Sequence, residues 1–163
     1  MILSTVRIFT VMMEDKRLFL DTNILLAASD QDRRHHRACF DLLESALGGE
    51  ASFYASGQVF REYLVVATRP TESNGLGMSR ANALKNVEEF RLCIQALEET
   101  SAVLERLINL VRHHRIQGKR IHDANLAAAM LEHGLRQLVT LNPEDFKVFP
   151  DLILLGPDSI VAQ

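Results

Sequence analysis

Short apolar blocks and longer amphipathic segments alternate along the chain, with the periods of buried strands and of helices. The first block, Leu18–Leu20, ends abruptly at Asp21 and predicts a buried strand of a parallel sheet. Similar blocks predict further strands over residues 51–55, 91–95, 136–142 and 152–155. Residues 91–95 also fit a helix that runs into a loop, so this third strand has an alternative.

The longer segments between these strands place apolar residues at helical spacing. The first helix follows the polar residues 30–37, has its apolar residues between Cys39 and Leu47, and is stopped by Gly48-Gly49. Further helices are predicted over residues 58–68, 79–90, 101–114 and 122–133, with Ser56 and Ser79 as N-caps and residues 71–77 as a loop. Strands that alternate with helices indicate an α/β fold, a three-layer α/β/α sandwich around a central parallel sheet.

The composition indicates one globular domain, because 163 residues of which 47% are hydrophobic are enough to bury a core. We expect this domain to span residues 17–163, preceded by residues 1–16 as an N-terminal extension or an extra edge segment. Residues 1–13 are too short and too interrupted by polar residues to span a membrane, and no small-residue cleavage pattern follows them. Met12 or Met13 is an alternative start of the natural chain.

The net charge of −3 excludes a protein that binds nucleic acid through an overall basic surface. A nucleic-acid site would have to be a local patch or depend on a metal ion. Cys39 and Cys93 are far apart and lie in apolar-periodic stretches. This indicates core residues of a protein in the reducing cytoplasm rather than a disulfide.

Acidic residues stand at positions where the predicted fold would bring them together. Asp21 ends the first strand, at the sheet edge where open α/β sheets bind ligands. Glu62 lies in a helix that is apolar on nearly all sides, and Asp123 begins an alanine-rich helix, where an acid also stabilises the helix dipole. Asn142 and Asp145 follow the fourth strand.

Each of these residues alone has a structural explanation, but carboxylates gathered within a few ångströms repel one another unless a cation joins them. Oxygen ligands select Mg²⁺ or Mn²⁺ over zinc. Such an ion activates water and neutralises the charge of a phosphodiester under attack. The sequence therefore predicts a magnesium or manganese site.

The acidic motifs and their order resemble the PIN domain superfamily, and within it the VapC-type toxins of toxin–antitoxin pairs. The motifs are Leu20-Asp21-Thr22-Asn23, Arg61-Glu62-Tyr63, His122-Asp123-Ala124 and Thr140-x-Asn142-x-x-Asp145-Phe146. The resemblance extends from about Leu18 to about Gly156. It implies a PIN-like sandwich, a Mg²⁺- or Mn²⁺-dependent endoribonuclease, an antitoxin partner and a homodimer.

The resemblance also implies roles for single residues. Asp21, Glu62 and Asp123 match the three acidic metal ligands of the family, and Glu62 or Asp123 would also take a proton from the attacking water. The position of a fourth family acid is Asn142 here, which puts a second metal ion in doubt, and Asp145 is a possible substitute.

Two polar residues match supporting positions of these motifs. Thr140 would orient a ligand or a water molecule. Asn23 would hydrogen-bond Asp21 or a metal-bound water, or simply form a turn.

Two other functions remain open at this stage. A non-catalytic PIN-like module that binds RNA or protein is compatible with the neutral Asn142. A phosphatase that uses a strand-end aspartate as its nucleophile would have a second acid two residues later, and Asn23 stands at that position.

Two basic clusters are candidates for contact with RNA. The first comprises Arg33, Arg34, His35, His36 and Arg37, and the second comprises Arg112, Arg115, Lys119 and Arg120 with His113, His114 and His122. The second cluster leads directly into Asp123 and is the better placed. The alternative explanation is a solvated helix end, because cationic side chains near a helix C-terminus complement its dipole. The adjacent histidines lack the spacing of zinc ligands.

Overall fold

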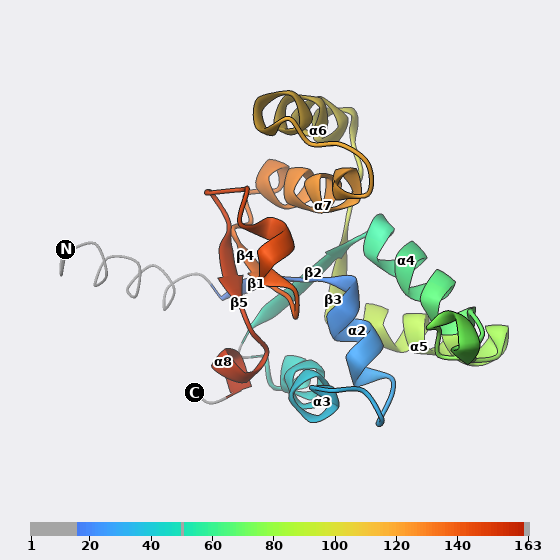
Figure 1. Cartoon of the computed structure of the whole chain (residues 1–163). Coiled ribbons are helices and arrows are strands. Elements are labelled where there is room, and N and C mark those ends of the chain that lie inside the picture. The colour runs from blue at the N-terminus through green and yellow to red at the C-terminus, as the bar shows by residue number, and fades with distance from the viewer. Residues whose placement is uncertain (1–15, 50, 162–163) are drawn as a thin grey trace.

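The computed structural model describes residues 16–49 and 51–161, and within them it has a five-stranded parallel sheet in the order β3-β2-β1-β4-β5 (Figure 1). The strands are β1 (Arg17–Leu20), β2 (Ser52–Ser56), β3 (Ile94–Leu97), β4 (Gln137–Val139) and β5 (Ile153–Leu155). β1 lies at the centre, paired with β2 on one side and β4 on the other. The strand order therefore reverses at β1, and a crevice at such a switch point is where open α/β sheets bind ligands.

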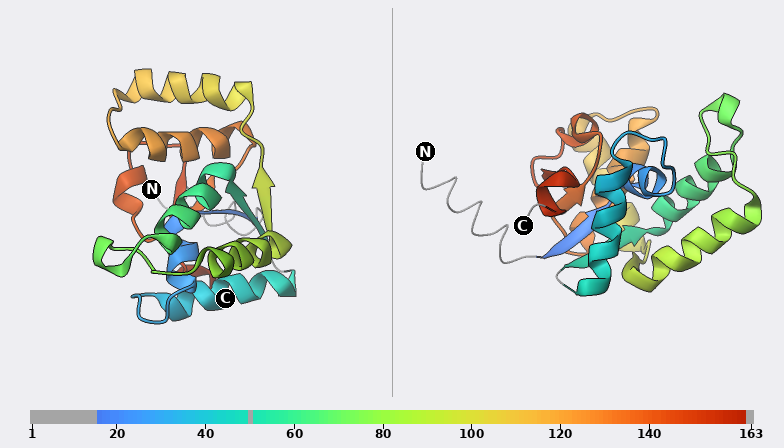
Figure 2. Two further views of the ribbon diagram at one scale, coloured as in Figure 1. Left: turned by 90° about the vertical axis from the view of Figure 1, so that its right-hand side faces the viewer. Right: turned by 90° about the horizontal axis from the view of Figure 1, so that it is seen from below.

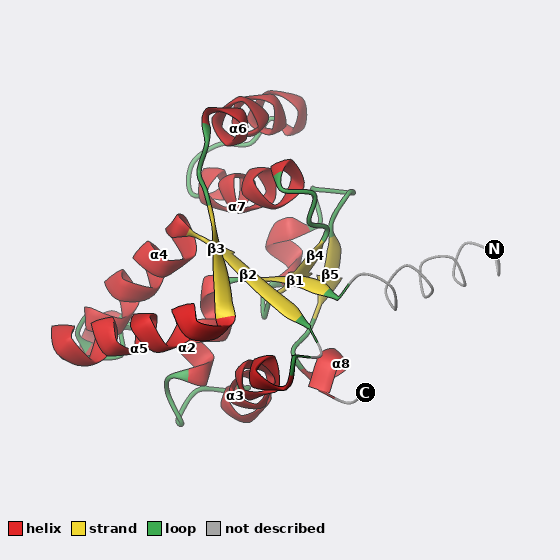
Figure 3. Cartoon of the chain, turned by 180° about the vertical axis from the view of Figure 1, so that it is seen from behind, coloured by secondary structure: helices red, strands yellow, loops and turns green. Residues whose placement is uncertain are grey.

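Helices cover both faces of this sheet. Their bounds are α2 (Thr22–Ala28), α3 (His36–Ser45), α4 (Gly57–Thr68), α5 (Arg80–Cys93), α6 (Ser101–His114), α7 (Arg120–Glu132) and α8 (Asp158–Val161), with 3₁₀ turns η1 (Ala46–Gly48), η2 (Thr71–Ser73) and η3 (Pro143–Phe146). α7 lies on one face with α6 outside it, and α2, α3 and α5 lie on the other (Figures 1 and 3). The predicted three-layer sandwich is confirmed.

The composition of the strands and of α7 explains this layering. Phe19, Leu20 and Leu138 are fully buried in the sheet, as expected of strands covered on both faces. α7 is rich in buried alanine, and Ala128 packs with Val103 of α6 in a small apolar cluster. Figure 2 shows α6 lying along α7. Small side chains let α7 approach its neighbours closely.

Among the described residues, periodicity predicts neither the four-residue α8 nor α2, the helix directly after Asp21. Six of its seven residues are buried, so the segment has no polar face to create a helical period. The predicted loop over residues 71–77 is confirmed as the connection between α4 and α5. There Gly75 lies so close to the backbone of Arg69 that a Cβ atom would clash.

Several predicted boundaries are wrong by a few residues. The strand expected over residues 91–95 is Ile94–Leu97, because α5 continues to Cys93 and the backbone N–H of Ile94 still bonds to Phe90 O. The pattern of apolar and polar residues over 91–95 fits the end of a helix as well as a strand. β4 ends at Val139 rather than at residue 142, and α7 begins at Arg120 rather than at residue 122.

Two predicted N-caps differ in what their hydroxyl groups do. Ser79 Oγ accepts the backbone N–H of Asn82 at 3.2 Å, as a capping serine should. Ser56 occupies the N-cap position of α4, but its side chain makes no cap hydrogen bond. Among the described residues, its Oγ atom is buried without a hydrogen-bond partner.

No helix within the described ranges is long and apolar enough to cross a membrane. The extension or edge segment expected over residues 1–16 lies, apart from Lys16, outside the described residues and stays a prediction.

Substitution by alanine should change the free energy of unfolding differently at Ser79 and at Ser56. We expect Ser79→Ala to lower the free energy of unfolding by about 1 kcal/mol through loss of the cap. Ser56→Ala should be neutral or stabilising, because it removes a buried hydroxyl without a partner. Urea denaturation of both variants measures the difference. A larger loss for Ser56→Ala than for Ser79→Ala would contradict the assignment.

Candidate functional site

A cavity of about 570 Å³ lies at the carboxyl edge of the sheet and is lined by Asp21, directly after β1, by residues of α2, α4 and α7, and by the segment after β4. All the acids singled out in the sequence line it, together with one amide side chain: Asp21, Glu62, Asp123, Asp145 and Asn142. The convergence predicted from the sequence is therefore confirmed. The acids come from segments that are far apart in the chain, and the sheet order brings them together.

Asp21 is the most firmly held of these acids. It follows the central strand and occupies the N-cap position of α2, with 8% of its surface exposed. Its Oδ2 atom accepts hydrogen bonds from Thr140 Oγ1 at 2.7 Å and from Asn23 Nδ2 at 2.8 Å. Its backbone N–H continues the sheet by bonding to Val139 O at 3.0 Å. The carboxylate is thus fixed by Asn23 in the first turn of α2 and by Thr140 directly after β4.

Thr140 and Asn23 are themselves fixed. The backbone N–H of Asn142 donates to Thr140 Oγ1 at 3.0 Å, and the backbone N–H of Leu141 donates to Asn23 Oδ1 at 3.1 Å. The hydrogen bond predicted from Asn23 to Asp21 is present. Asn23 therefore joins the end of β1 to the segment after β4, besides its place in the first turn of α2.

Glu62 is held by neutral donors at both of its oxygens. Thr22 Oγ1 donates to Oε2 at 2.9 Å, and Gln58 Nε2 donates to Oε1 at 2.7 Å. His122 Nδ1 lies 3.9 Å from Oε1. Thr22 follows Asp21 directly, so the same turn that positions the first acid also orients the second.

The acids affect one another electrostatically. Burial is the main cause that raises the pKa of Asp21 to about 6, and repulsion by Glu62 and Asp123 adds to it, against the hydrogen bond from Thr140. Burial likewise raises the pKa of Asp123 to about 6, with repulsion by Asp145 and Glu62, against the attraction of Arg120. A bound cation would reverse both shifts.

The donor set fits a hard divalent cation. The lining supplies carboxylate, amide and hydroxyl oxygens, which Mg²⁺ and Mn²⁺ prefer. Among the described residues, no three His, Cys, Asp or Glu side chains are arranged to hold a metal ion directly. An ion held here would therefore have to keep water molecules between itself and some of the acids, as Mg²⁺ usually does.

The first basic cluster, residues 33–37, lies away from this cavity and bonds locally. Arg33 pairs with Asp30 at 3.5 Å, and Arg37 pairs with Asp41 at 2.9 Å. None of the five residues lines the cavity. The cluster precedes and begins α3, whose N-cap is His35, so the alternative of cations that complement a helix C-terminus does not apply to it.

The second basic cluster lies where α6 ends and α7 begins. Its His122 lines the cavity, and Arg120 is close enough to lower the pKa of Asp123. Arg112, Arg115 and Lys119 are exposed and lie outside the lining. Within this cluster, Arg120 and His122 are therefore the residues nearest to the acids.

The structure adds site residues that the sequence interpretation missed. Arg61 of α4 and Arg69, directly after that helix, line the cavity beside the apolar Leu26, Val65 and Val66. Gln58 contacts Glu62 directly. Helical spacing was a usable signal for Gln58, because it lies four residues before Glu62 and shares its helix face.

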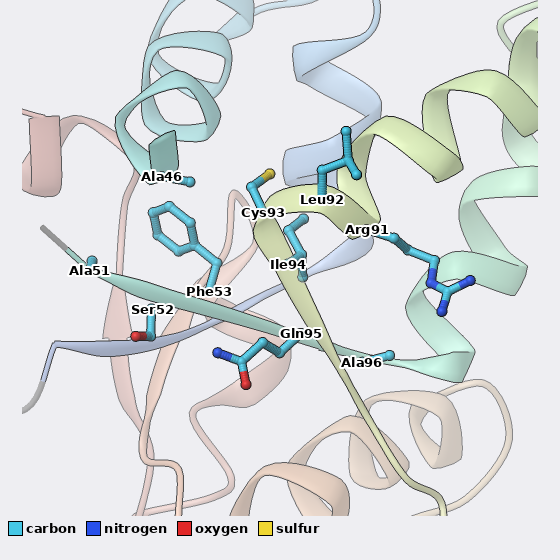
Figure 4. Close-up of a pocket in the computed structure, with 10 residues that line it drawn as sticks. All are labelled: Ala46, Ala51, Ser52, Phe53, Arg91, Leu92, Cys93, Ile94, Gln95 and Ala96. Atoms are coloured by element: carbon cyan, nitrogen blue, oxygen red, sulfur yellow. The ribbon is translucent and has the colours of Figure 1, made fainter. Parts of the chain in front are cut away.

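A second cavity, of about 500 Å³, lies at the opposite end of β2 and β3 (Figure 4). Figure 4 shows Phe53 and Cys93 on one side of these strands and Ser52 and Gln95 on the other. Arg91 is the one residue in its lining with a side chain that is charged at neutral pH. Of the two cavities, only the first therefore brings carboxylates together.

Comparison with known proteins gives a family match and related folds. The PIN domain model matches residues 18–152. Ribonuclease VapC24 of Mycobacterium tuberculosis is 31% identical over 138 residues, which cover 81% of this chain and 90% of that protein.

Two solved structures illustrate the shared fold. One is VapBC2 of Rickettsia felis bound to a DNA fragment of the promoter, with a TM-score of 0.65 and 19% sequence identity. The match covers 86% of this chain and 98% of the matched Rickettsia chain. VapC20 of Mycobacterium tuberculosis, a toxin that cleaves the sarcin–ricin loop, has a TM-score of 0.60 at 16% identity over 81% and 95% of the two chains.

The raised pKa of Asp21 predicts a stability effect in metal-free protein. Because the folded chain holds a proton on Asp21 up to about pH 6 while the unfolded chain releases it near 3.8, stability falls as the pH rises through that window. Asp21→Asn can keep both hydrogen bonds and loses the charge. We expect it to raise the free energy of unfolding at pH 7 in EDTA by about 2 kcal/mol, and by almost nothing at pH 4.

Chemical denaturation at the two pH values measures this difference. Asp151→Asn, at an exposed acid in a turn, is the control and should change neither value. Equal stabilisation by Asp21→Asn at pH 4 and pH 7 would show that the effect is not electrostatic.

Proposed function

The chain belongs to the PIN domain family, and we propose that it is a Mg²⁺- or Mn²⁺-dependent endoribonuclease, the toxin of a toxin–antitoxin pair. The observation that supports this most directly is the cavity in which Asp21, Glu62 and Asp123 meet, where burial raises the pKa of Asp21 and of Asp123. The ribonuclease named among the relatives supports RNA as the substrate. The reaction would be hydrolysis of a phosphodiester bond.

The residues proposed to hold the ion are Asp21, Glu62 and Asp123, directly or through water. When bound, the ion would supply a positive charge for the phosphodiester and lower the pKa of a bound water molecule. Asp21 suits a permanent ligand, because its carboxylate is buried and fixed by Thr140 and Asn23. Asn142 and Asp145 line the same cavity and are the proposed ligands of any second ion.

The chain also supplies a group for proton transfer. Asp123 is half-buried and lines the cavity beside the proposed ion, within reach of a water molecule held there. We assign the proton from the attacking water to Asp123 in preference to Glu62, whose oxygens both accept hydrogen bonds from the chain.

The RNA backbone is proposed to run across the rim between α4 and α7. Arg61 and Arg69 stand on one side, and Arg120 stands on the other, with Arg112, Arg115 and Lys119 beyond it. Phosphate groups of a strand lying across the acids would then meet cations on both sides.

The partners follow from the same assignment. We propose a small antitoxin protein, and the crystal structure of the VapBC2 complex of Rickettsia felis supports the existence of such a partner. We further propose a homodimer that acts in the cytoplasm, where both free cysteines, Cys39 and Cys93, would stay reduced.

Metal-dependent cleavage of RNA is the first test. With Mg²⁺ or Mn²⁺, the wild type should cut a labelled RNA panel, EDTA should stop the reaction, and Asp21→Asn should reduce the rate by roughly 100-fold or more. Asp151→Asn serves as the matched control and should cut normally. Undiminished cleavage by Asp21→Asn would refute the proposed site, and an inactive, well-folded wild type would favour a binding module.

The salt dependence of binding tests the proposed path of the RNA. Using Asp21→Asn to prevent cleavage, Arg120→Ala and Arg61→Ala should each weaken RNA binding and reduce the slope of log K against log salt by about 0.7, the value for one lost phosphate contact on a single strand. Arg37→Ala, in the cluster that is paired away from the cavity, should leave the slope unchanged. Equal slopes for all three variants would refute this path.

A further inference from the structure

We infer that Gln58, supported by Asn125, is a positioning residue that sets the distance between Glu62 and Asp123 for a shared divalent cation. The inference rests on the proposed function and adds to it a residue that is not itself a ligand. Its basis is one side chain that bonds to the helix of Glu62 and to the helix of Asp123 at the same time.

The amide of Gln58 makes a hydrogen bond with each of its available groups. Nε2 donates to Glu62 Oε1 at 2.7 Å and to the carbonyl oxygen of His122 at 3.1 Å. Oε1 accepts from Asn125 Nδ2 at 2.7 Å. An amide has two N–H donors, and both are used here.

These contacts allow the amide one orientation. If its oxygen and nitrogen were exchanged, the oxygen would face the Glu62 carboxylate and the His122 carbonyl, and the NH₂ group would face the NH₂ group of Asn125. Acceptors would meet acceptors and donors would meet donors. Gln58 is also buried, with 4% of its surface exposed, so water cannot replace a lost partner easily.

The contacts join the two places where the metal ligands originate. Gln58 lies in the first turn of α4, one turn before Glu62 on the same helix face. The carbonyl that it binds belongs to His122, directly before Asp123 in the first turn of α7. Its own backbone N–H donates to Glu99 Oε1 at 3.0 Å, which fixes the start of α4 to the segment after β3.

The neutrality of the amide matters as much as its geometry. An arginine or lysine at position 58 would also orient Glu62, but its positive charge would compete with the cation for that carboxylate. A glutamate would add a fifth negative charge to the four acids of the cavity. Glutamine holds the ligand while leaving its charge available to the ion, as groups that surround metal ligands commonly do.

Binding of Mn²⁺ alone, followed by electron paramagnetic resonance of the free ion, tests the inference without RNA. Gln58→Met keeps the length of the side chain and removes its hydrogen bonds. We expect its Mn²⁺ dissociation constant to rise roughly tenfold or more. Asn125→Ala, which only frees the amide to turn, should give a smaller rise in the same direction.

A double-mutant cycle with Glu62→Gln separates positioning from general damage. If Gln58 acts through Glu62, adding Gln58→Met to Glu62→Gln should change the dissociation constant by less than about twofold. In cleavage assays, Gln58→Met should raise the Mn²⁺ concentration needed for half-maximal rate while much of the rate returns at saturating Mn²⁺. A structural role would lower the rate at every concentration.

Asn86→Leu is the matched control. Asn86 Nδ2 donates to Tyr63 Oη at 2.8 Å, so the variant removes an amide contact to the same helix α4, away from the acids. It should bind Mn²⁺ like the wild type. Wild-type affinity in Gln58→Met, or the same loss with and without Glu62, would overturn the inference.

The proposed function can be judged separately. If the wild type cleaves RNA with metal and Asp21→Asn does not, the function stands whatever the result at Gln58. If the wild type binds no Mn²⁺, the metal site and the role of Gln58 fail together.

Discussion

The burial of several carboxylates together at one edge of the sheet is the constraint on which the rest of the site depends. Four acids line one cavity, and burial together with mutual repulsion raises the pKa of both Asp21 and Asp123. Such a cluster opposes folding in the absence of a cation. The remainder of the structure must therefore hold the acids in place without neutralising them. The buried core of the sheet, with Phe19 and Leu20 leading directly to Asp21, provides the rigid base.

The groups that hold the acids are mostly neutral. Thr140 and Asn23 donate to Asp21, and Thr22 and Gln58 donate to Glu62. Each is a hydroxyl or an amide, which orients a carboxylate and leaves its charge in place. The cationic side chains Arg61, Arg69 and Arg120 stand at the rim instead, where they can meet phosphate groups. This division of roles is consistent with a site that binds a metal ion inside and a polyanion outside.

The fold makes this arrangement from short local steps. The turn that directly follows β1 supplies Asp21, Thr22 and Asn23. Thr140 comes directly after β4, the strand that pairs with β1. α4 and α7 then bring Glu62 and Asp123 over the same edge, and Gln58 joins the two helices. In the proposed site, the neutral Asn142 stands where the resemblance to the family predicts an acid, so a second ion would have less negative charge around it than the first.

Local sequence determined the side-chain chemistry and most of the elements, because apolar periodicity and strand-end acids are properties of neighbouring residues. From these came the layered fold, the acids that line the cavity and the resemblance to the PIN family. The same reasoning failed at α2, whose burial removes the polar face that reveals a helix, and at the start of β3, where helix and strand patterns coincide.

Only the tertiary structure decided that β1 lies between β2 and β4 and that Gln58 meets Asn125, 67 residues away. Contacts of this kind depend on how segments far apart in the chain pack together, and the pattern of neighbouring residues does not predict that packing.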